Sequence, residues 1–206
     1  VQARLMKVLV TGAKGQLASD LVPLLEAAGF TIAAFSSAEL DISDLAAVLE
    51  AVKKAKPGII INPAAYTKVD LAEKEKDRAY AVNALGAENL ALAAKEANCP
   101  IVHVSTDFVF DGRSPVPCVE EAQTNPLSVY GASKLAGEKS VAAATDAHVI
   151  VRTSWLYGVE GNNFVKTILR LASEREVLRI VYGQTGTPTW RADLAAAIAG
   201  ICKSIE

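Results

Sequence analysis

The sequence predicts an α/β fold in which a parallel sheet is covered by helices on both faces. Short runs rich in β-branched residues alternate with longer stretches rich in alanine and leucine, whose apolar residues recur at helical spacing. Runs such as Ile59-Ile60-Ile61 are apolar at every position, which is typical of strands buried on both faces of a doubly wound parallel sheet. In such a sheet the ligand lies outside the carboxyl ends of the strands.

The alternation divides the chain into six strands and six helices. The expected strands are residues 7–11, 31–35, 58–64, 101–105, 149–153 and 178–182. The expected helices are residues 17–28, 43–55, 71–97, 127–144, 163–175 and 191–205. Residues 111–126 carry glycine and proline breakers instead of a periodic pattern. Because this long loop follows the fourth strand, we expect it at the ligand edge of the sheet.

Composition and charge exclude several classes of protein. The 206 residues include 21 Lys+Arg and 23 Asp+Glu, a net charge of −2, and 51% of them are hydrophobic. This composition excludes a disordered chain. Because the chain has no excess of basic residues, we expect no nucleic-acid partner. No apolar run reaches the length of a membrane span, so we expect no membrane partner.

The cysteines and histidines predict no metal site. Cys99, Cys118 and Cys202 are an odd number without C-x-x-C spacing, which predicts neither a disulfide framework nor a zinc site. We expect these thiols to be buried small residues in a reducing cytoplasm. His103 alternates with apolar neighbours on an expected central strand, and we expect it to be a hydrogen-bonded core residue.

A glycine turn follows the first expected strand. Residues 11–18 read Thr-Gly-Ala-Lys-Gly-Gln-Leu-Ala, a G-x-x-G-x-x-A pattern. Glycines there let backbone N–H groups approach a pyrophosphate, which the N-terminus of the next helix also attracts. Lys14 falls between the glycines and no G-K-[ST] follows, so a P-loop is disfavoured. Nucleotide binding is favoured over the alternative of a plain turn because this turn opens the first βα unit.

Two further motifs supply groups for acid–base chemistry. Tyr130 and Lys134 form a Y-x-x-x-K pair on one helical face. The lysine charge would favour the phenolate and bring the phenol closer to its working range. Thr106 stands at the end of the fourth expected strand, where its hydroxyl could hold a carbonyl oxygen. Taken alone, a Y-x-x-x-K pair can occur by chance on the solvated face of a helix. A hydroxyl at the end of a strand can likewise serve only a local turn.

Together these motifs resemble the extended, sugar-nucleotide branch of the short-chain dehydrogenase/reductase superfamily, and within it the family of dTDP-4-dehydrorhamnose reductases. The resemblance covers nearly the whole chain. It is carried by residues 12–17, 39–42, 62–70, 105–112, 130–138, 152–158, 161–164 and 184–189. The R-T-S-W block at 152–155 and the G-N-N-F block at 161–164 separate the chain from generic reductases of the superfamily.

The resemblance implies a Rossmann fold and NAD(P)H-dependent reduction of the 4-keto group of dTDP-4-dehydro-L-rhamnose to dTDP-L-rhamnose. The implied catalytic residues are Thr106, Tyr130 and Lys134. Tyr130 would protonate the ketone oxygen and Thr106 would hold it. Lys134 would lower the phenol pKa and hold the nicotinamide ribose.

The resemblance also implies residues that bind the cofactor and the substrate. Besides Tyr130 and Lys134, the cofactor residues are Gly12, Gly15, Gln16 and Leu17 at the pyrophosphate, Asp41 and Ile42 near the adenine, and Ala64, Ala65 and Tyr66 beside the ribose and nicotinamide. The sugar pocket would be lined by Val69, Phe108 and Trp155, with Phe108 standing where a tyrosine is common. At the end of the second strand, Ser36 and Ser37 could contact a 2′-phosphate, so we expect NADPH, with NADH also accepted.

The domain organisation follows from the same resemblance. Residues 1–206 would form the NAD(P)-binding domain with substrate-pocket loops at 108–126 and 155–190, while most of the family's C-terminal substrate domain is absent. A homodimer is implied. Some relatives hold Mg²⁺ at a dimer contact, which this chain does not support.

Two alternatives stay open. An epimerase or dehydratase on the same fold is less favoured, because only Asp107 follows the catalytic hydroxyl before Phe108. A non-catalytic dinucleotide-binding regulatory subunit is favoured by the shortened C-terminal part and disfavoured by the intact catalytic set.

Overall fold

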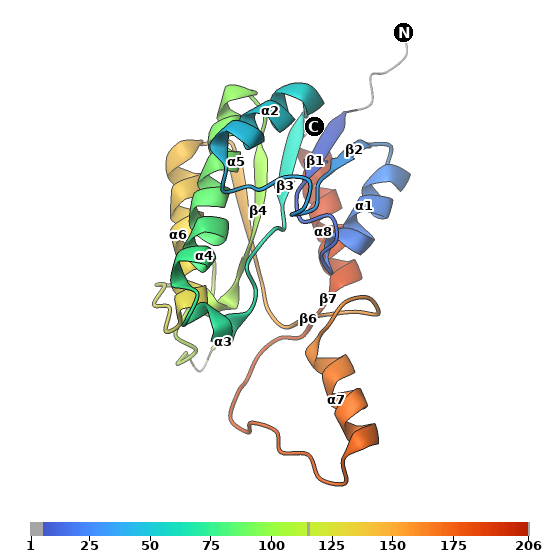
Figure 1. Cartoon of the computed structure of the whole chain (residues 1–206), viewed down its shortest axis with the longest axis vertical. Coiled ribbons are helices and arrows are strands. Elements are labelled where there is room, and N and C mark those ends of the chain that lie inside the picture. Colours follow the sequence, from blue (N-terminus) through green and yellow to red (C-terminus); the bar gives the residue numbers. More distant parts are fainter. Residues whose placement is uncertain (1–5, 115, 206) are drawn as a thin grey trace.

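The computed structural model describes residues 6–114 and 116–205, and a parallel sheet forms its centre (Figure 1). The strand order is β2-β1-β3-β4-β5, and every neighbouring pair is parallel. The strands are β1 Lys7–Val10, β2 Thr31–Ala34, β3 Ile59–Asn62, β4 Ile101–Thr106 and β5 His148–Thr153. The predicted doubly wound fold is confirmed.

Helices cover both faces of the sheet (Figure 1). Two helices pack on one face, α1 Ala18–Ala27 and α8 Arg191–Ser204. Three pack on the other, α2 Leu45–Ala55, α5 Gly86–Glu96 and α6 Val129–Ala144.

The two cores follow from the alternation of side chains along each strand. Val8 and Val10 of β1 belong to the cluster beneath α1 and α8, whereas Leu9 belongs to the opposite cluster. On β3, Ile59 and Ile61 likewise face one side and Ile60 the other. The order 2-1-3 places the switch point of the sheet between β1 and β3, where a doubly wound fold binds its ligand.

The strand expected at 178–182 was wrong. The small second sheet instead pairs β6 Leu156–Tyr157 with β7 Thr189–Trp190. Residues 178–182 have the composition of a strand, but Val181 and Tyr182 are 73% and 103% exposed. The segment is therefore not packed beside another strand. Helix α7 Phe164–Glu174, just before it, extends away from the main body and buries none of its residues (Figure 1).

The single helix expected at 71–97 was also wrong. The structure breaks it into α3 Val69–Ala72, α4 Lys76–Tyr80, a π-helical turn η1 Ala81–Leu85, and α5. Two glutamates of the break are engaged elsewhere: Glu73 accepts from the Val129 N–H at 2.8 Å, and Glu75 accepts from the Tyr66 hydroxyl at 3.0 Å.

The π-helical turn buries the side chain of Asn83. Its amide accepts from the Tyr66 N–H at 2.8 Å and donates to the Tyr66 carbonyl at 3.1 Å and to the Ser133 hydroxyl at 2.9 Å. Inserted turns of this kind are frequent at functional sites. Here the turn fastens the segment after β3 to α6.

The predicted cysteine environment was correct at two positions. Cys99 and Cys202 are buried, but Cys118 is exposed because it lies in the irregular loop and not in a helix or strand.

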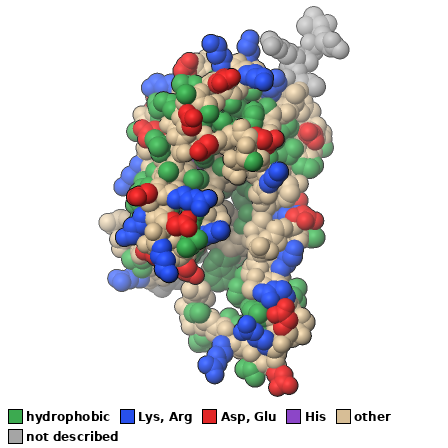
Figure 2. Space-filling model, in the orientation of Figure 1, with side chains coloured by type: hydrophobic (Ala, Val, Ile, Leu, Met, Phe, Trp, Pro, Cys, Tyr) green, Lys and Arg blue, Asp and Glu red, His purple; other side chains and the backbone are tan. Residues whose placement is uncertain are grey.

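Acidic and basic side chains are interspersed on the face shown in Figure 2, in keeping with the small net charge. Among the described helices, none combines the length and the apolar character needed to cross a bilayer.

Gly137 tests the packing of α6 on the π-helical turn. A Cβ at this position would overlap the backbone oxygen of Asn83, so Gly137→Ala should lower the free energy of unfolding by about 1–3 kcal/mol. Gly200→Ala in α8 is the matched control: its Cβ would meet nothing within 4 Å, and it should raise stability by about 0.5–1 kcal/mol. Urea unfolding measures both, and equal effects would contradict the close contact.

Candidate active site

A cavity of about 1090 Å³ opens at the carboxyl ends of β1, β3 and β4. It brings together the predicted site residues with two exceptions, Ser36 and Tyr66. Its lining includes Gly12, Gly15, Gln16, Leu17, Asp41, Ile42, Ala64, Ala65, Val69, Thr106, Phe108, Tyr130, Lys134 and Trp155. Tyr66 is buried behind the wall, where its hydroxyl bonds Glu75.

The glycine turn forms the floor of the cavity at the switch point. Gly12 has φ +59°, and a Cβ there would lie 3.0 Å from the Ala64 Cα. The turns after β1 and β3 are therefore in backbone contact, and a side chain at Gly12 would fill the cradle between them. Helix α1 begins at Ala18 and presents its N-terminus to this floor. The cradle fits a pyrophosphate.

One wall of the cavity is fixed by local hydrogen bonds. The Asp41 carboxylate accepts from the N–H and hydroxyl of Ser43 at 2.9 and 2.7 Å, and these bonds lower the pKa of Asp41. The Ile42 carbonyl accepts from the Asn89 amide at 2.9 Å. These hydrogen bonds fix the conformation of this wall.

The two serines that follow β2 have different surroundings, and only Ser37 faces the cavity. The Ser36 hydroxyl is buried and donates to Glu39 at 2.6 Å, so it is not available to a phosphate. Ser37 lines the cavity together with Lys14, which the sequence had suggested only as evidence against a P-loop.

Thr106 and Tyr130 meet because α6 begins very close to the turn after β4. Thr106 ends β4, and a short 3₁₀ turn, Asp107–Val109, follows. A Cβ at Gly131 would overlap the Phe108 carbonyl oxygen, so glycine permits this approach. The Phe108 ring meets the Tyr130 ring edge to face, with centroids 5.4 Å apart.

The Tyr130 phenol is protonated at neutral pH. Burial raises its pKa above the usual value, a hydrogen bond with Thr106 acts in the opposite direction, and the charge of Asp107 adds to the rise. The expectation that Lys134 brings the phenol pKa down was therefore wrong in direction, because burial outweighs the lowering influences and the pKa lies above its ordinary value.

Of the side chains in the described residues, Lys134 is the largest that is fully buried, with 1% of its surface exposed. Its Nζ donates to the Val104 carbonyl at 2.7 Å and lies 3.4 Å from His103 Nε2. Burial lowers the pKa of Lys134 to about 8, and the charge of Glu138 opposes this. Within the part of the chain that is described, no carboxylate forms an ion pair with this ammonium group.

Behind Lys134 lies a row of buried polar groups that sequence reasoning missed. The Thr11 hydroxyl donates to Asn62 Oδ1 at 2.7 Å, and Asn62 Nδ2 lies 3.1 Å from His103 Nδ1. The expectation that His103 is a hydrogen-bonded core residue is confirmed. The sequence held one indication of this row of polar groups: Asn62 is a polar residue at the end of an otherwise apolar strand.

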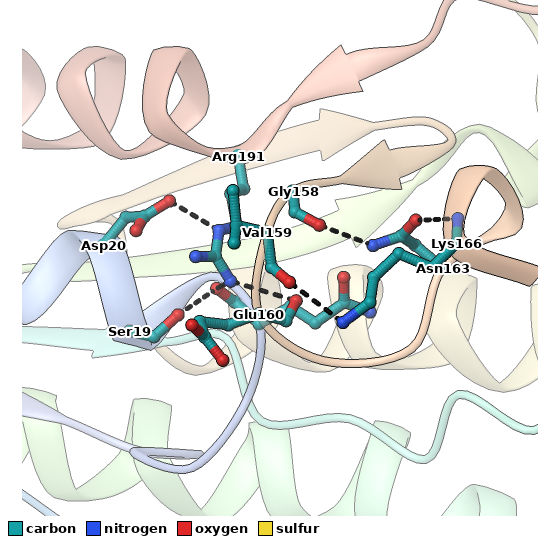
Figure 3. Close-up of polar contacts among 9 residues, drawn as sticks. Ser19, Asp20, Gly158, Val159, Glu160, Asn163, Lys166 and Arg191 are labelled. Carbon is teal, nitrogen blue, oxygen red and sulfur yellow. Dashed lines mark hydrogen bonds and ion pairs between the residues drawn. The ribbon is translucent and has the colours of Figure 1, made fainter. Parts of the chain in front are cut away.

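Arg191 ties the glycine turn to the loop before α7 (Figure 3). Its Nε lies 2.6 Å from Asp20 Oδ2, and its Nη1 donates to the carbonyls of Gln16 at 3.4 Å and Glu160 at 3.1 Å. A Cβ at Gly158 would overlap the Arg191 side chain. The first turn of α1, the loop and α8 therefore converge on one buried guanidinium group.

The G-N-N-F block shapes the same loop. Asn163 caps α7 by accepting from the Lys166 N–H at 3.0 Å, and it donates to the Gly158 carbonyl at 2.8 Å (Figure 3). Gln16, expected at the pyrophosphate, donates through Nε2 to the Asn162 carbonyl at 2.6 Å, and its Oε1 is buried with no partner among the described residues. Residues 160–162 thereby line the cavity beside the glycine turn.

Two residues of the R-T-S-W block have different roles. Arg152 donates two hydrogen bonds to the Glu138 carboxylate, at 3.0 and 2.7 Å, and a third to the Glu120 carbonyl at 3.0 Å. It therefore joins β5, α6 and the irregular loop. Trp155 lines the cavity with φ +46°, a backbone conformation that bulky residues rarely adopt.

Comparison with known proteins gives a consistent result. Residues 6–206 match the family described as the RmlD substrate binding domain. A dTDP-4-dehydrorhamnose reductase of Aggregatibacter actinomycetemcomitans is 44% identical over 97% of this chain and 68% of its own length. The spore coat polysaccharide biosynthesis protein SpsK of Bacillus subtilis is 42% identical over 93% of this chain and 68% of its own length. The chain thus spans about two thirds of these relatives.

A solved structure is similar over the entire chain. The dTDP-4-dehydrorhamnose reductase of Bacillus anthracis, in complex with NADP, has a TM-score of 0.95 and 44% sequence identity, covering 100% of this chain and 73% of that one.

The buried ion pair of Arg191 should contribute more to stability than an exposed one. Arg191→Ala leaves Asp20 and two loop carbonyls without their partner, and we expect a loss of about 3 kcal/mol in the free energy of unfolding. Arg170→Ala breaks an exposed pair with Glu174 and should cost less than about 1 kcal/mol. Denaturant titration of both variants measures the two losses. Losses of similar size would contradict a stabilising role for the buried contacts of Arg191.

Lys134 should make stability depend on pH. Its pKa is about 8 in the folded chain and 10.5 in its ordinary state, so between these values the unfolded chain binds more protons and stability rises with pH. From pH 7 to pH 10 the unaltered chain should gain roughly 2–3 kcal/mol relative to Lys134→Met. Urea unfolding at the two pH values provides the measurement, and a constant difference would refute burial of the charged lysine.

Proposed function

The chain belongs to the RmlD substrate binding domain family, that of the dTDP-4-dehydrorhamnose reductases, and we propose that its cavity reduces the 4-keto group of dTDP-4-dehydro-L-rhamnose to give dTDP-L-rhamnose. It is an NAD(P)H-dependent oxidoreductase. The observation that carries the proposal is that Thr106, Tyr130 and Lys134 line the same cavity as the glycine turn.

The cofactor site suits NADPH. The backbone contact between Gly12 and Ala64 leaves a cradle for the pyrophosphate beside the N-terminus of α1. At the adenine end, Lys14 and Ser37 line the cavity and could contact the 2′-phosphate. Neither makes the paired contact of an arginine, so we infer that NADH is also accepted.

The catalytic residues divide the work of protonating the ketone oxygen. The bound cofactor supplies the hydride. The Thr106 hydroxyl holds the ketone oxygen, and Tyr130, whose raised pKa keeps it protonated, donates its proton to that oxygen. The Lys134 ammonium then stabilises the phenolate that remains, and its remaining N–H is free to hold the ribose hydroxyls.

The substrate pocket would use the far end of the cavity. Val69, Phe108 and Trp155 line it, and we infer that the loops at 108–126 and 155–190 shape it, with residue 115 outside the described part. We further infer that residues 1–206 hold the cofactor domain and that α7, which leaves Phe164 and Leu169 63% and 66% exposed, belongs to the part of the chain beside the substrate. A homodimer and a cytoplasmic location stay predictions, as does the expectation that Mg²⁺ at a dimer contact is not supported by residues of this chain.

Tyr130→Phe tests the proposed reaction. Removing the proton donor should lower kcat by about 10²- to 10⁴-fold while the Kd for NADPH changes little. Oxidation of NADPH with dTDP-4-dehydro-L-rhamnose, beside fluorescence titration of NADPH, measures the two effects.

Tyr80→Phe is the matched control, since Tyr80 of α4 is 41% exposed and does not line the cavity, and it should leave turnover unchanged. Full activity in Tyr130→Phe would refute the assigned role. NADPH binding without turnover, both in the unaltered chain and in a longer chain that includes the rest of the family's substrate domain, would instead support the non-catalytic binding subunit.

A further inference from the structure

Lys134 carries its charge in the interior with few partners. An ammonium group has three N–H donors and no acceptor, and a buried charge is costly unless it is hydrogen-bonded. Here the Val104 carbonyl accepts one donor at 2.7 Å. Among the described residues, the other hydrogen-bonding contact of Nζ is His103 Nε2 at 3.4 Å. The state of this imidazole therefore decides whether the ammonium group is held in place or repelled.

His103 is neutral in the folded chain. It is fully buried, and burial together with the charge of Lys134 holds the pKa of the imidazole well below its ordinary value. A neutral imidazole has one nitrogen that donates and one that accepts. The tautomer is set by the hydrogen bond of the other nitrogen, and here that partner is the Asn62 amide.

Two proton arrangements satisfy the same heavy-atom positions, because the oxygen and nitrogen of an amide can exchange places. In the first, Asn62 donates to Nδ1, so Nε2 keeps the proton and points it at Lys134. That arrangement requires a neutral lysine. In the second, the Asn62 oxygen accepts from Nδ1–H, its nitrogen donates to the Thr11 hydroxyl, and Nε2 accepts from the ammonium group. Only the second suits a charged Lys134.

We propose that His103 is a positioning residue for Lys134, accepting a hydrogen bond from the ammonium group through Nε2 in the Nδ1–H tautomer. The charge of Lys134 selects this tautomer, and an Asn62 amide turned with its oxygen toward Nδ1 satisfies it. This inference rests on the proposed function and deepens it. Lys134 is held by β4 at two adjacent residues, His103 and Val104. Thr11 directly precedes Gly12, so the row of hydrogen bonds joins the glycine turn to the catalytic lysine.

Nuclear magnetic resonance of the imidazole nitrogens tests the tautomer directly. The chain has only two histidines, so ¹⁵N-histidine labelling gives two ring patterns, and His148 serves as the internal reference. At pH 6.5 the proposal predicts a pyrrole-type Nδ1 and a pyridine-type Nε2 for His103. A protonated Nε2, or a doubly protonated ring, would overturn it.

A lysine variant then identifies the donor. Lys134→Met should shift the His103 Nε2 resonance toward that of a nitrogen without a hydrogen-bond donor. Lys139→Met, an exposed lysine on the same helix, should leave it unchanged. An unchanged Nε2 resonance in Lys134→Met would also overturn the proposal. These readouts need no turnover, so the proposal and the assigned reaction can fail separately.

Variants of His103 test the consequence for catalysis. His103→Gln keeps an acceptor, whereas His103→Phe removes it. We expect kcat to fall at least tenfold in His103→Phe, with recovery of part of the loss in His103→Gln and little change in the KM for the sugar nucleotide. Equal kcat losses in two variants of equal stability would overturn the positioning role.

Discussion

The close approach of two backbone turns at the switch point is the constraint on which the rest of the structure depends. Gly12 after β1 lies against Ala64 after β3, and a Cβ at Gly12 would come within 3.0 Å of the Ala64 Cα. This contact sets the floor of the cavity and directs the N-terminus of α1 toward it. A second close approach, Gly131 of α6 against the Phe108 carbonyl, brings Tyr130 beside Thr106. The site is thus assembled by glycines at which neighbouring segments touch.

The interior combines two apolar cores with one polar row. Most of the sheet is packed by aliphatic side chains, which stabilise the fold by removing apolar surface from water. The row of Thr11, Asn62, His103 and Lys134 crosses this interior at hydrogen-bonding distances. Burying a lysine charge lowers stability, and such costs are common where a site must hold a charged group ready for chemistry. Function, not stability, explains this row.

Much of the fold could be predicted from the sequence, because the alternation of strand and helix patterns is a local signal. The five strands of the main sheet and most helix ends lie within two residues of their expected positions. The run at 178–182 failed because strand composition needs a partner, and Tyr182 has none around it. The helix expected at 71–97 failed because Glu73 and Asn83 bond to groups far along the chain, which periodicity does not show. For the same reason the sequence indicated which residues would share a cavity but not that Arg191 or His103 would support them.

The most direct test of the account follows the hydrogen that is transferred. NADPH carrying deuterium at the transferring position of the nicotinamide is supplied with dTDP-4-dehydro-L-rhamnose in ordinary water, and the sugar product is examined by mass spectrometry. A cavity that places the cofactor on the glycine turn beside Thr106 and Tyr130 predicts one deuterium in the product, at the carbon that was the ketone. A reduced product without deuterium would contradict the account.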